Sequence, residues 1–277
     1  MRSELKAKYD NLKTILAETG GLLVAYSGGV DSTLLLKAAT KVLGDRALAV
    51  TATSETYPPQ EFAEAKKLAT EIGARQRVIH TSELEVEQFC NNPPERCYYC
   101  KTELFGKLLE IAREEGLAAV ADGSNVDDMG DYRPGMKAAK ELGVISPLRE
   151  AGLTKDEIRE ISKELGLPTW DKPSFACLAS RFPYGDRITM EKLTQVAAAE
   201  QVLRGLGLGQ LRVRHHGQTA RIEVEPEGFE TVIRSDNRAR IVEEFHKIGY
   251  LYVTLDLDGY RTGSMNEPLG AQSGSKD

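Results

Sequence analysis

A glycine-rich turn near the N-terminus carries residues suited to binding phosphate. The segment reads Ala25-Tyr26-Ser27-Gly28-Gly29-Val30-Asp31-Ser32-Thr33 and lies between an apolar stretch and a leucine-rich stretch. A buried strand, a turn and a helix start leave N–H groups unpaired beside the positive end of a helix dipole. Glycines let the backbone approach a phosphate closely, hydroxyls add donors, and a carboxylate can hold Mg2+. The turn predicts a nucleotide phosphate site comprising Ala25, Ser27, Gly28, Gly29, Asp31 and Ser32.

Three of the four cysteines have the spacing of metal ligands or reactive thiols. Cys97 and Cys100 form a Cys-x-x-Cys pair, and Cys177 lies much further along the chain. Three thiolates suit a [4Fe-4S] cluster whose fourth iron is open to sulfide. A redox or persulfide pair, a zinc site and inert thiols remain alternatives, although no second Cys-x-x-Cys pair completes a zinc ribbon. Cys90, beside Phe89, is expected to be a buried structural thiol.

Acidic and amide residues follow an apolar stretch at 117–121, which we expect to be a strand. The run is Asp122-Gly123-Ser124-Asn125-Val126-Asp127-Asp128. Because oxygen ligands suit Mg2+, we predict that Gly123, Asn125 and Asp127 contact the nucleotide or the metal. The alternative is a polar turn that caps a helix. Arg133 is expected to neutralise a phosphate, or to pair with Asp131 instead.

Basic residues gather on two short predicted strands near the C-terminus. Arg212 and Arg214 share one face by the two-residue period of a strand. Guanidinium groups match the geometry of phosphate and carboxylate, so the pair predicts an anion pocket. A solvated face is the alternative.

Strands and helices alternate over the first part of the chain. We expect strands at 21–26, 46–52, 77–81, 117–121 and 143–147, and helices at 3–19, 30–43, 60–72, 101–116 and 154–165. This alternation predicts a doubly wound, five-stranded parallel sheet. Ligands bind such sheets outside the carboxyl ends of the strands, so Thr51 and Ser54 become expected adenine contacts.

The pattern changes near residue 185. Beyond it we expect helices at 190–206 and 233–248 and strands at 211–215, 221–225 and 250–256, which form a smaller α+β unit. We therefore predict a nucleotide-binding domain at 1–185, a substrate-binding or anion-binding domain at 186–267 and a flexible tail at 268–277.

Composition excludes several classes of protein. The net charge is −6 and the chain holds no run of basic residues, which argues against a nucleic-acid partner. The start of the chain lacks the apolar core of a signal peptide, and no apolar run approaches the roughly 20 residues of a bilayer-spanning helix. We expect a cytoplasmic protein with reduced cysteines and no membrane partner.

The glycine turn differs from a Walker loop because no lysine follows its glycines. The residues Ser27-Gly28-Gly29-Val30-Asp31-Ser32 instead resemble the pyrophosphate loop (PP-loop) of the ATP pyrophosphatase superfamily. This likeness alone leaves NAD synthetase, GMP synthetase and tRNA thiolases open.

Further segments resemble one family within that superfamily, the LarE sulfurtransferases of nickel-pincer nucleotide (lactate racemase) cofactor synthesis. The resemblance spans about residues 1–267. The segments that carry it are 27–32, 122–128, 131–135, 146–148, 173–181 and 252–267.

The resemblance implies an adenine nucleotide alpha hydrolase-like fold and a two-step reaction. ATP adenylylates a carboxylate of pyridinium-3,5-biscarboxylic acid mononucleotide, and pyrophosphate leaves. Sulfur then displaces AMP to give a thiocarboxylate, and a second round treats the other carboxylate. ATP and Mg2+ are the implied cofactors, and the implied partners are a small anionic nucleotide, a sulfide or other sulfur donor, and further copies of the chain in a homo-oligomer.

The resemblance also assigns roles to individual residues. Ser180, Glu200, Arg181, Arg212 and Arg214 would line the substrate site. The residues that would act in catalysis are Asp31, Cys177, Ser180 and Glu200. In one version of the family Cys177 gives up its own sulfur and becomes dehydroalanine. In the other, three cysteines hold an iron–sulfur cluster that carries a replaceable sulfide, which the presence of Cys97 and Cys100 favours. A tRNA thiolase, an amidotransferase and a non-catalytic nucleotide-binding or cluster-binding protein are the remaining alternatives.

Overall fold

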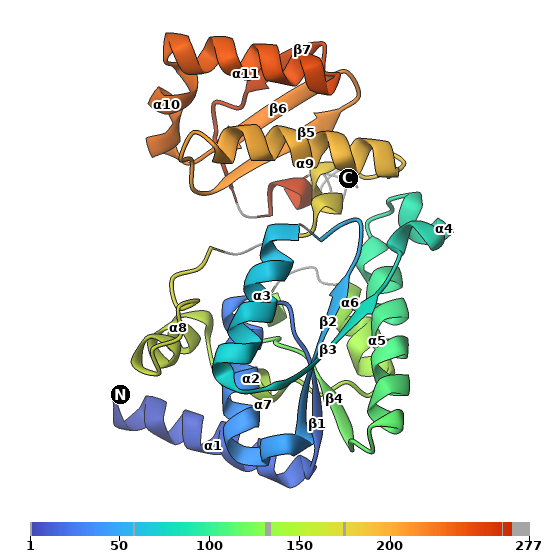
Figure 1. Ribbon diagram of the computed structural model, residues 1–277, viewed down its shortest axis with the longest axis vertical. Helices are drawn as coiled ribbons and strands as arrows, with labels where there is room; N and C mark the ends of the chain where they lie inside the picture. The colour runs from blue at the N-terminus through green and yellow to red at the C-terminus, as the bar shows by residue number, and fades with distance from the viewer. Residues whose placement is uncertain (1, 58, 131–133, 174–175, 262, 268–277) are drawn as a thin grey trace, which may run out of the picture. The chain divides into compact units, whose positions relative to one another are not determined.

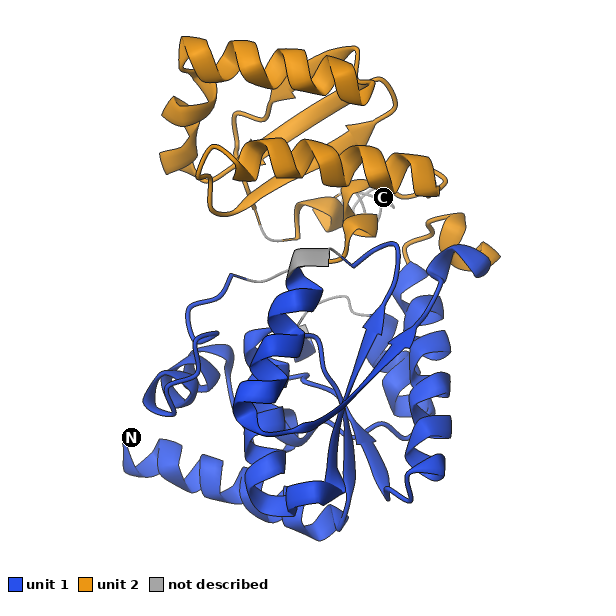
Figure 2. Ribbon diagram, viewed as in Figure 1, with its two compact units in different colours: residues 1–86, 95–175 blue, residues 87–94, 176–277 orange. Residues whose placement is uncertain are grey.

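The computed structural model describes residues 2–57, 59–130, 134–173, 176–261 and 263–267. Its contacts divide the chain into two compact units, which are coloured separately in Figure 2. Unit 1 consists of residues 1–86 and 95–175, and unit 2 of residues 87–94 and 176–277. Within the described residues, no helix has the length and apolar character needed to cross a membrane.

Unit 1 is built on a parallel sheet, as predicted. Its strands run in the order β3-β2-β1-β4 (Figure 1). Their bounds are β1 (Leu22–Ala25), β2 (Ala47–Thr53), β3 (Arg75–His80) and β4 (Ala119–Ala121). In place of the fifth predicted strand there is a single parallel bridge between Ala121 and Ile145. The segment stays short because Pro147, whose φ is preset for a helix, begins the next helix two residues later.

Helices cover both faces of this sheet, which confirms the doubly wound α/β class. Alternate residues of β1 face opposite layers: Leu22 and Val24 pack in one apolar cluster and Leu23 in another. The first cluster draws on α1 (Ser3–Thr19), α2 (Val30–Leu43), α3 (Pro59–Ile72), α7 (Pro147–Glu150) and α8 (Lys155–Glu164). The second draws on α5 (Arg96–Glu114) and α6 (Pro134–Glu141). The 3-10 turns of unit 1 are η1 (Gly44–Arg46), η2 (Glu83–Glu85) and η3 (Val126–Gly130).

Strand order places two loops next to each other at the carboxyl edge of the sheet. β1 pairs with β2 on one side and with β4 on the other, all in parallel. The chain leaves β1 toward one face and β4 toward the other, which makes this the topological switch point where α/β sheets bind ligands. The glycine turn after β1 and the acidic turn after β4 both begin there.

The helix that carries Cys97 and Cys100 starts earlier than predicted. We expected the Cys-x-x-Cys pair in a loop before a helix at Lys101, but α5 begins at Arg96 and contains both cysteines in its first turns. Cysteine and tyrosine are modest helix formers, so local propensity gave no sign of this start. Packing of Phe105, Leu108 and Ile111 in the core stabilises the helix as a whole.

Unit 2 has its own sheet and core. β5 (Leu211–His216) and β6 (Thr219–Val224) form an antiparallel hairpin, and β7 (Tyr252–Leu255) adds parallel to β6. Leu203 of α9, Val213 of β5 and Phe245 of α11 share its apolar core. The helices are α4 (Glu87–Cys90), α9 (Met190–Arg204), α10 (Phe229–Ile233) and α11 (Ser235–Ile248), and the 3-10 turns are η4 (Leu178–Arg181), η5 (Pro226–Gly228) and η6 (Ser264–Asn266).

Candidate active site

The glycine turn forms a tight hydroxyl-linked loop between β1 and α2. Gly28 has a φ of +68°, which favours glycine, and Gly29 is the N-cap of α2. The Ser27 and Ser32 hydroxyl oxygens lie 3.1 Å apart, and the Ser27 N–H donates to Ser32 Oγ over 3.3 Å. The side chains therefore brace the loop from within, while the first N–H groups of α2 have no intrahelical acceptor. This is the local geometry of an anion site.

Close packing leaves no room for a side chain at Gly28. A Cβ built there would lie 2.6 Å from the Cβ of Ala65 on α3. A cavity of about 350 Å3 opens beside Gly28, and Lys67 of α3 and Lys172 lie in its lining. The Lys172 ammonium contacts Glu61 at 2.7 Å and Glu64 at 2.9 Å.

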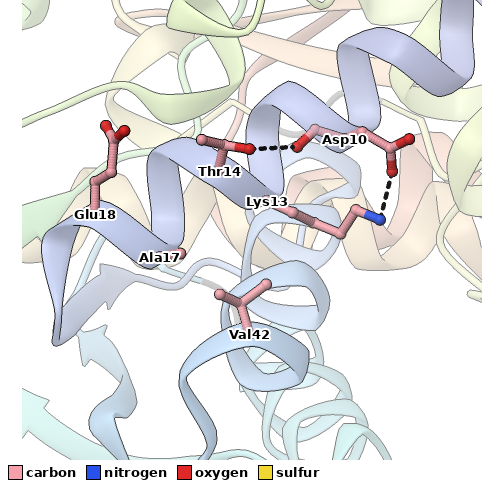
Figure 3. Close-up of a pocket in the computed structure, with 6 residues that line it drawn as sticks. All are labelled: Asp10, Lys13, Thr14, Ala17, Glu18 and Val42. Carbon is pink, nitrogen blue, oxygen red and sulfur yellow. Dashed lines mark hydrogen bonds and ion pairs between the residues drawn. The ribbon is translucent and has the colours of Figure 1, made fainter.

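A second, larger pocket lies away from the loop. It has a volume of about 600 Å3, and Figure 3 shows the side chains that line it on α1 and α2: Asp10, Lys13, Thr14, Ala17, Glu18 and Val42. Val42 lies in the last turn of α2, which belongs to the amino ends of the strands. Ligands of open α/β sheets bind at the opposite, carboxyl edge. We therefore do not assign this pocket to the active site.

Asp31, in the first turn of α2, is the polar centre of the switch point. Its Oδ1 accepts a hydrogen bond of 3.3 Å from Asn125 Nδ2, and its Oδ2 pairs with the ammonium of Lys155. Gly123 packs against the same helix start, since a Cβ there would lie 3.1 Å from the Ser32 nitrogen. The structure thus brings together Asp31, Ser32, Gly123 and Asn125, which we had predicted from two separate segments.

Most carboxylates of the acidic turn accept hydrogen bonds from other groups of the same chain. Asp122 accepts from the hydroxyls of Ser124 at 2.7 Å and Ser146 at 2.8 Å. Asp127 Oδ2 accepts the backbone N–H of Lys155 at 2.7 Å, at the start of α8. The helix-capping alternative therefore describes Asp127 in this state, and a nucleotide contact by the turn stays a prediction. Arg133 lies outside the described residues.

The two expected adenine contacts lie in and just after the carboxyl-terminal part of β2, the neighbour of β1. Thr51 is buried on β2, and its hydroxyl accepts a 3.2 Å hydrogen bond from Gln76. Ser54 follows β2, and its hydroxyl lies 3.1 Å from that of Thr56. Since Val50 pairs with Ala25 in register, Thr51 sits next to the start of the glycine turn.

The thiols differ in exposure. Cys97 and Cys177 are exposed, Cys100 is half-buried, and Cys90 is buried as expected for a structural thiol. The Cys100 thiol lies 3.9 Å from a carboxylate oxygen of Glu83, whose other oxygen accepts from Thr56. Among the residues that the structure describes, no three or more His, Cys, Asp or Glu side chains group as metal ligands.

In unit 2, a buried ion pair fixes the backbone around Cys177. Arg181 is fully buried and binds both carboxylate oxygens of Glu200, at 2.7 and 3.0 Å. Its third nitrogen donates to the Cys177 carbonyl at 3.1 Å and to the Ser180 hydroxyl at 2.8 Å. Arg181 therefore couples η4, which follows Cys177, to helix α9.

The two arginines of β5 are buried, so the solvated-face alternative does not hold. Arg214 forms a two-point contact with Glu223 on β6, at 2.9 and 2.7 Å, and also donates to the Ser180 carbonyl. Arg212 donates to the Leu211 carbonyl at 2.6 Å and lies 5.0 Å from the Tyr260 ring centroid. Burial, and then the nearby charge of Arg181, lowers the pKa of Arg212 to about 10. An anion beside Arg212 would relieve this electrostatic cost.

Arg181→Met is expected to lower the free energy of unfolding by about 3 kcal/mol at neutral pH, because it leaves the Glu200 carboxylate buried without its main partner. Arg204, whose guanidinium is 3.7 Å from Glu200, keeps the loss at the lower end of the usual range. Burial alone would raise the pKa of Glu200, but the charge and hydrogen bonds of Arg181 outweigh it and hold that pKa below its ordinary value. The stabilisation by the Arg181–Glu200 ion pair is therefore present at neutral pH and is lost as the pH falls through the pKa of Glu200 in the folded protein. The loss of unfolding free energy in Arg181→Met consequently becomes smaller in acid.

Urea unfolding as a function of pH, with hydrogen exchange at β5 and β6 to locate the change, measures this effect. Arg187→Met is the matched control, because Arg187 makes an exposed ion pair with Glu87 in the same unit. The prediction would be contradicted if Arg181→Met lost no more unfolding free energy than the control, or if its loss did not change with pH.

Sequence reasoning missed three residues of these clusters. The sequence places Lys155 in a predicted helix and Glu223 in a predicted strand, and it places Tyr260 only within the segment 252–267 that carries the family resemblance. Glu223 had a usable signal: opposite charges on neighbouring strands often pair, and Glu223 is the register partner of Arg212. Lys155 had none, because its contact with Asp31 joins residues far apart in the chain.

Comparisons with known proteins agree with this architecture. The NAD synthase family model matches residues 4–93, which include the glycine turn. An uncharacterized protein of Synechocystis sp. is 47% identical over 265 residues, which are 96% of this chain and 99% of that protein. The argininosuccinate synthase of Haloarcula marismortui is 31% identical over 160 residues, 54% of this chain and 38% of that enzyme.

A characterised relative spans nearly the whole chain. The pyridinium-3,5-bisthiocarboxylic acid mononucleotide synthase of Lactiplantibacillus plantarum is 42% identical over 267 residues, which are 96% of each protein. The similarity covers both units, including the glycine turn and the residues around Cys177. The chain therefore belongs to the LarE family of PP-loop proteins, the pyridinium-3,5-bisthiocarboxylic acid mononucleotide synthases.

Proposed function

We propose that this chain is an ATP-dependent sulfurtransferase that inserts sulfur into pyridinium-3,5-biscarboxylic acid mononucleotide, in nickel-pincer nucleotide cofactor biosynthesis. The observation that carries the proposal is 42% identity across 96% of both chains with a curated synthase of the corresponding bisthiocarboxylic acid. The match of the NAD synthase family model to residues 4–93, which hold the glycine turn, supports the use of ATP.

Two chemical steps are needed for each sulfur. A carboxylate is a poor electrophile, so a carboxylate oxygen of the substrate first attacks the α-phosphorus of ATP, and pyrophosphate leaves. The resulting acyl adenylate has a good leaving group. A sulfur nucleophile then attacks the acyl carbon, the bond to AMP breaks, and a thiocarboxylate remains. Repetition on the second carboxylate gives the bisthiocarboxylic acid.

Unit 1 would catalyse the first step, the adenylylation of the carboxylate. The loop residues Ser27, Gly28, Gly29 and Ser32 would hold the β- and γ-phosphates at the start of α2. Asp31 would be the Mg2+ ligand, because carboxylate oxygen is a donor that Mg2+ prefers. Backbone N–H groups and Mg2+ stabilise the charge that develops on departing pyrophosphate. Ala25, Thr51 and Ser54 would meet the nucleoside, and Gly123, Asn125, Asp127 and Arg133 would complete the site.

Unit 2 would hold the acceptor. Arg212 and Arg214 lie side by side on β5, and the lowered pKa of Arg212 marks a place where an anion is favoured. We assign the substrate's phosphate or carboxylates to this pair, with Arg181, Ser180 and Glu200 positioning the Cys177 segment. Ser180 fits this role because its hydroxyl donates to the Cys177 carbonyl at 2.9 Å.

The donor set of three thiols fits an iron–sulfur cluster. Cys97 and Cys100 lie three residues apart on α5, so they face the same side of the helix. We propose that they and Cys177 hold a [4Fe-4S] cluster, whose open iron would supply a replaceable sulfide. Cys177 itself is a second candidate sulfur source, because its thiol is exposed and its backbone is held by Arg181. We also propose that the chain forms a homo-oligomer, and this part of the proposal rests on the family resemblance alone.

Cys97→Ala is expected to reduce the yield from several thiocarboxylates per chain to at most one, because two thiolates cannot hold the cluster. The experiment is anaerobic turnover with ATP, Mg2+, substrate and sulfide, followed by iron, sulfide and intact-protein mass analysis. Cys90→Ala removes a buried thiol outside the proposed set and should keep multiple turnover. Full multiple turnover by Cys97→Ala would refute the cluster, and loss of the Cys177 sulfur from the wild-type chain without bound iron would establish the sacrificial route.

A further inference from the structure

The Lys155 ammonium lies against Asp31, the carboxylate that we assign to Mg2+. Its ammonium pairs with Asp31 Oδ2, while Asn125 donates to Oδ1. The carboxylate that we assign to Mg2+ is thus already neutralised by a side chain from another element. Lys155 is the first residue of α8, far from Asp31 in the sequence.

The backbone of Lys155 is held firmly. Its N–H donates to Asp127 Oδ2 at 2.7 Å. The preceding residue, Thr154, forms a capping box with Glu157, and Glu157 is tied to Lys8 of α1 at 2.7 Å. The helix start therefore projects the Lys155 side chain toward the glycine turn from a fixed point.

The ion pair itself is exchangeable. The side chains of Lys155 and Asp31 are 27% and 23% exposed, so water and ions reach them. A divalent cation prefers carboxylate oxygen and would compete directly with the ammonium for Asp31. The displaced ammonium would then lie beside the loop that holds the phosphates, and phosphate oxygens are its natural partners.

We propose that Lys155 is a phosphate-binding residue of the nucleotide site. It pairs with Asp31 in the nucleotide-free protein and passes to a β- or γ-phosphate oxygen when the Mg2+ nucleotide binds. This exchange gives both Asp31 and Lys155 a partner of opposite charge in each state and makes binding of metal and phosphate mutually dependent. The proposal rests on the proposed function, which places Mg2+ at Asp31 and the pyrophosphate at the loop.

Isothermal titration with Mg2+–pyrophosphate and with AMP tests the exchange. Lys155→Met is expected to weaken pyrophosphate binding about tenfold or more, because it removes a charge-assisted hydrogen bond, and to leave AMP binding unchanged. Lys155→Arg keeps the charge and should restore most of the affinity. Arg2→Met, which removes the exposed ion pair of Arg2 with Glu160 of α8, is the matched control and should bind pyrophosphate like the wild type.

A double-mutant cycle separates phosphate binding from simple neutralisation of Asp31. If Lys155 only neutralised Asp31, Lys155→Met would have no effect in an Asp31→Asn background; under the proposal it still weakens pyrophosphate binding there. Unchanged pyrophosphate affinity in Lys155→Met would overturn the proposal while the proposed function stands. Failure of the wild-type chain to bind Mg2+–pyrophosphate would instead refute the proposed function.

Discussion

Cys177→Ala is expected to abolish thiocarboxylate formation while pyrophosphate release continues. Adenylylation needs the glycine turn and Mg2+ in unit 1, whereas sulfur delivery needs the thiol of Cys177 whether it acts as a cluster ligand or as the sulfur source. The acyl adenylate would then accumulate or hydrolyse to AMP and the starting carboxylate. The measurement is a paired assay of pyrophosphate release and of sulfur in the product by mass spectrometry.

Cys177→Ala tests the role of the thiol in the reaction separately from any effect on folding. The Cys177 side chain is exposed, so its loss opens no core cavity. Its structural contacts run through its carbonyl, which accepts from Arg181 and Ser180 and which alanine retains. Thiocarboxylate formation by Cys177→Ala at the wild-type rate would remove Cys177 from the mechanism under both sulfur routes.

Gly28→Ala is expected to weaken Mg2+–ATP binding about a hundredfold or more, because the loop must move to accept a methyl group. Two costs combine at this position. The φ of +68° disfavours any side chain, and the new Cβ would lie 2.6 Å from the Cβ of Ala65. The affinity is measured by titration calorimetry, and the fold is checked by thermal unfolding.

Two further variants test whether the loss of ATP affinity in Gly28→Ala arises from the loop. Gly20→Ala is the matched control: Gly20 has a similar φ of +64° at the end of α1, but within the described part of the chain no heavy atom lies within 4 Å of a Cβ placed there. It should lower stability by about 1 kcal/mol and leave ATP affinity unchanged. Adding Ala65→Gly to Gly28→Ala relieves the steric contact but not the strained φ, so it should restore affinity only in part. Wild-type ATP affinity in Gly28→Ala would contradict the assignment of the loop.

The nucleotide half of the site could be predicted from sequence because its signals are local. A strand, a glycine turn and a helix start follow one another within residues 22–43, and the parallel sheet then places the turn after β4 beside them. The contact between Asp31 and Asn125 follows from that topology alone. Predicting Lys155 would have required the packing of α8, which no periodicity in the sequence encodes.

Other features depend on tertiary packing and escaped prediction. Residues 87–94 group with unit 2, where Asn92 donates to the Phe182 and Pro183 carbonyls, and no local pattern indicates such a contact. The strand expected at 143–147 was shortened by a proline helix start, and α6 and α10 were not predicted at all. The burial of Arg212 and Arg214 reversed the usual expectation for arginine, because Glu223 supplies Arg214 with a carboxylate inside the sheet.

The most direct test of the sulfurtransferase assignment is anaerobic incubation of the wild-type chain with ATP, Mg2+, sulfide and pyridinium-3,5-biscarboxylic acid mononucleotide, with quantification of every product. We expect each sulfur-for-oxygen exchange in the nucleotide to be matched by one AMP and one pyrophosphate. Formation of ADP and phosphate, or release of pyrophosphate with no sulfur in the product, would contradict this expectation.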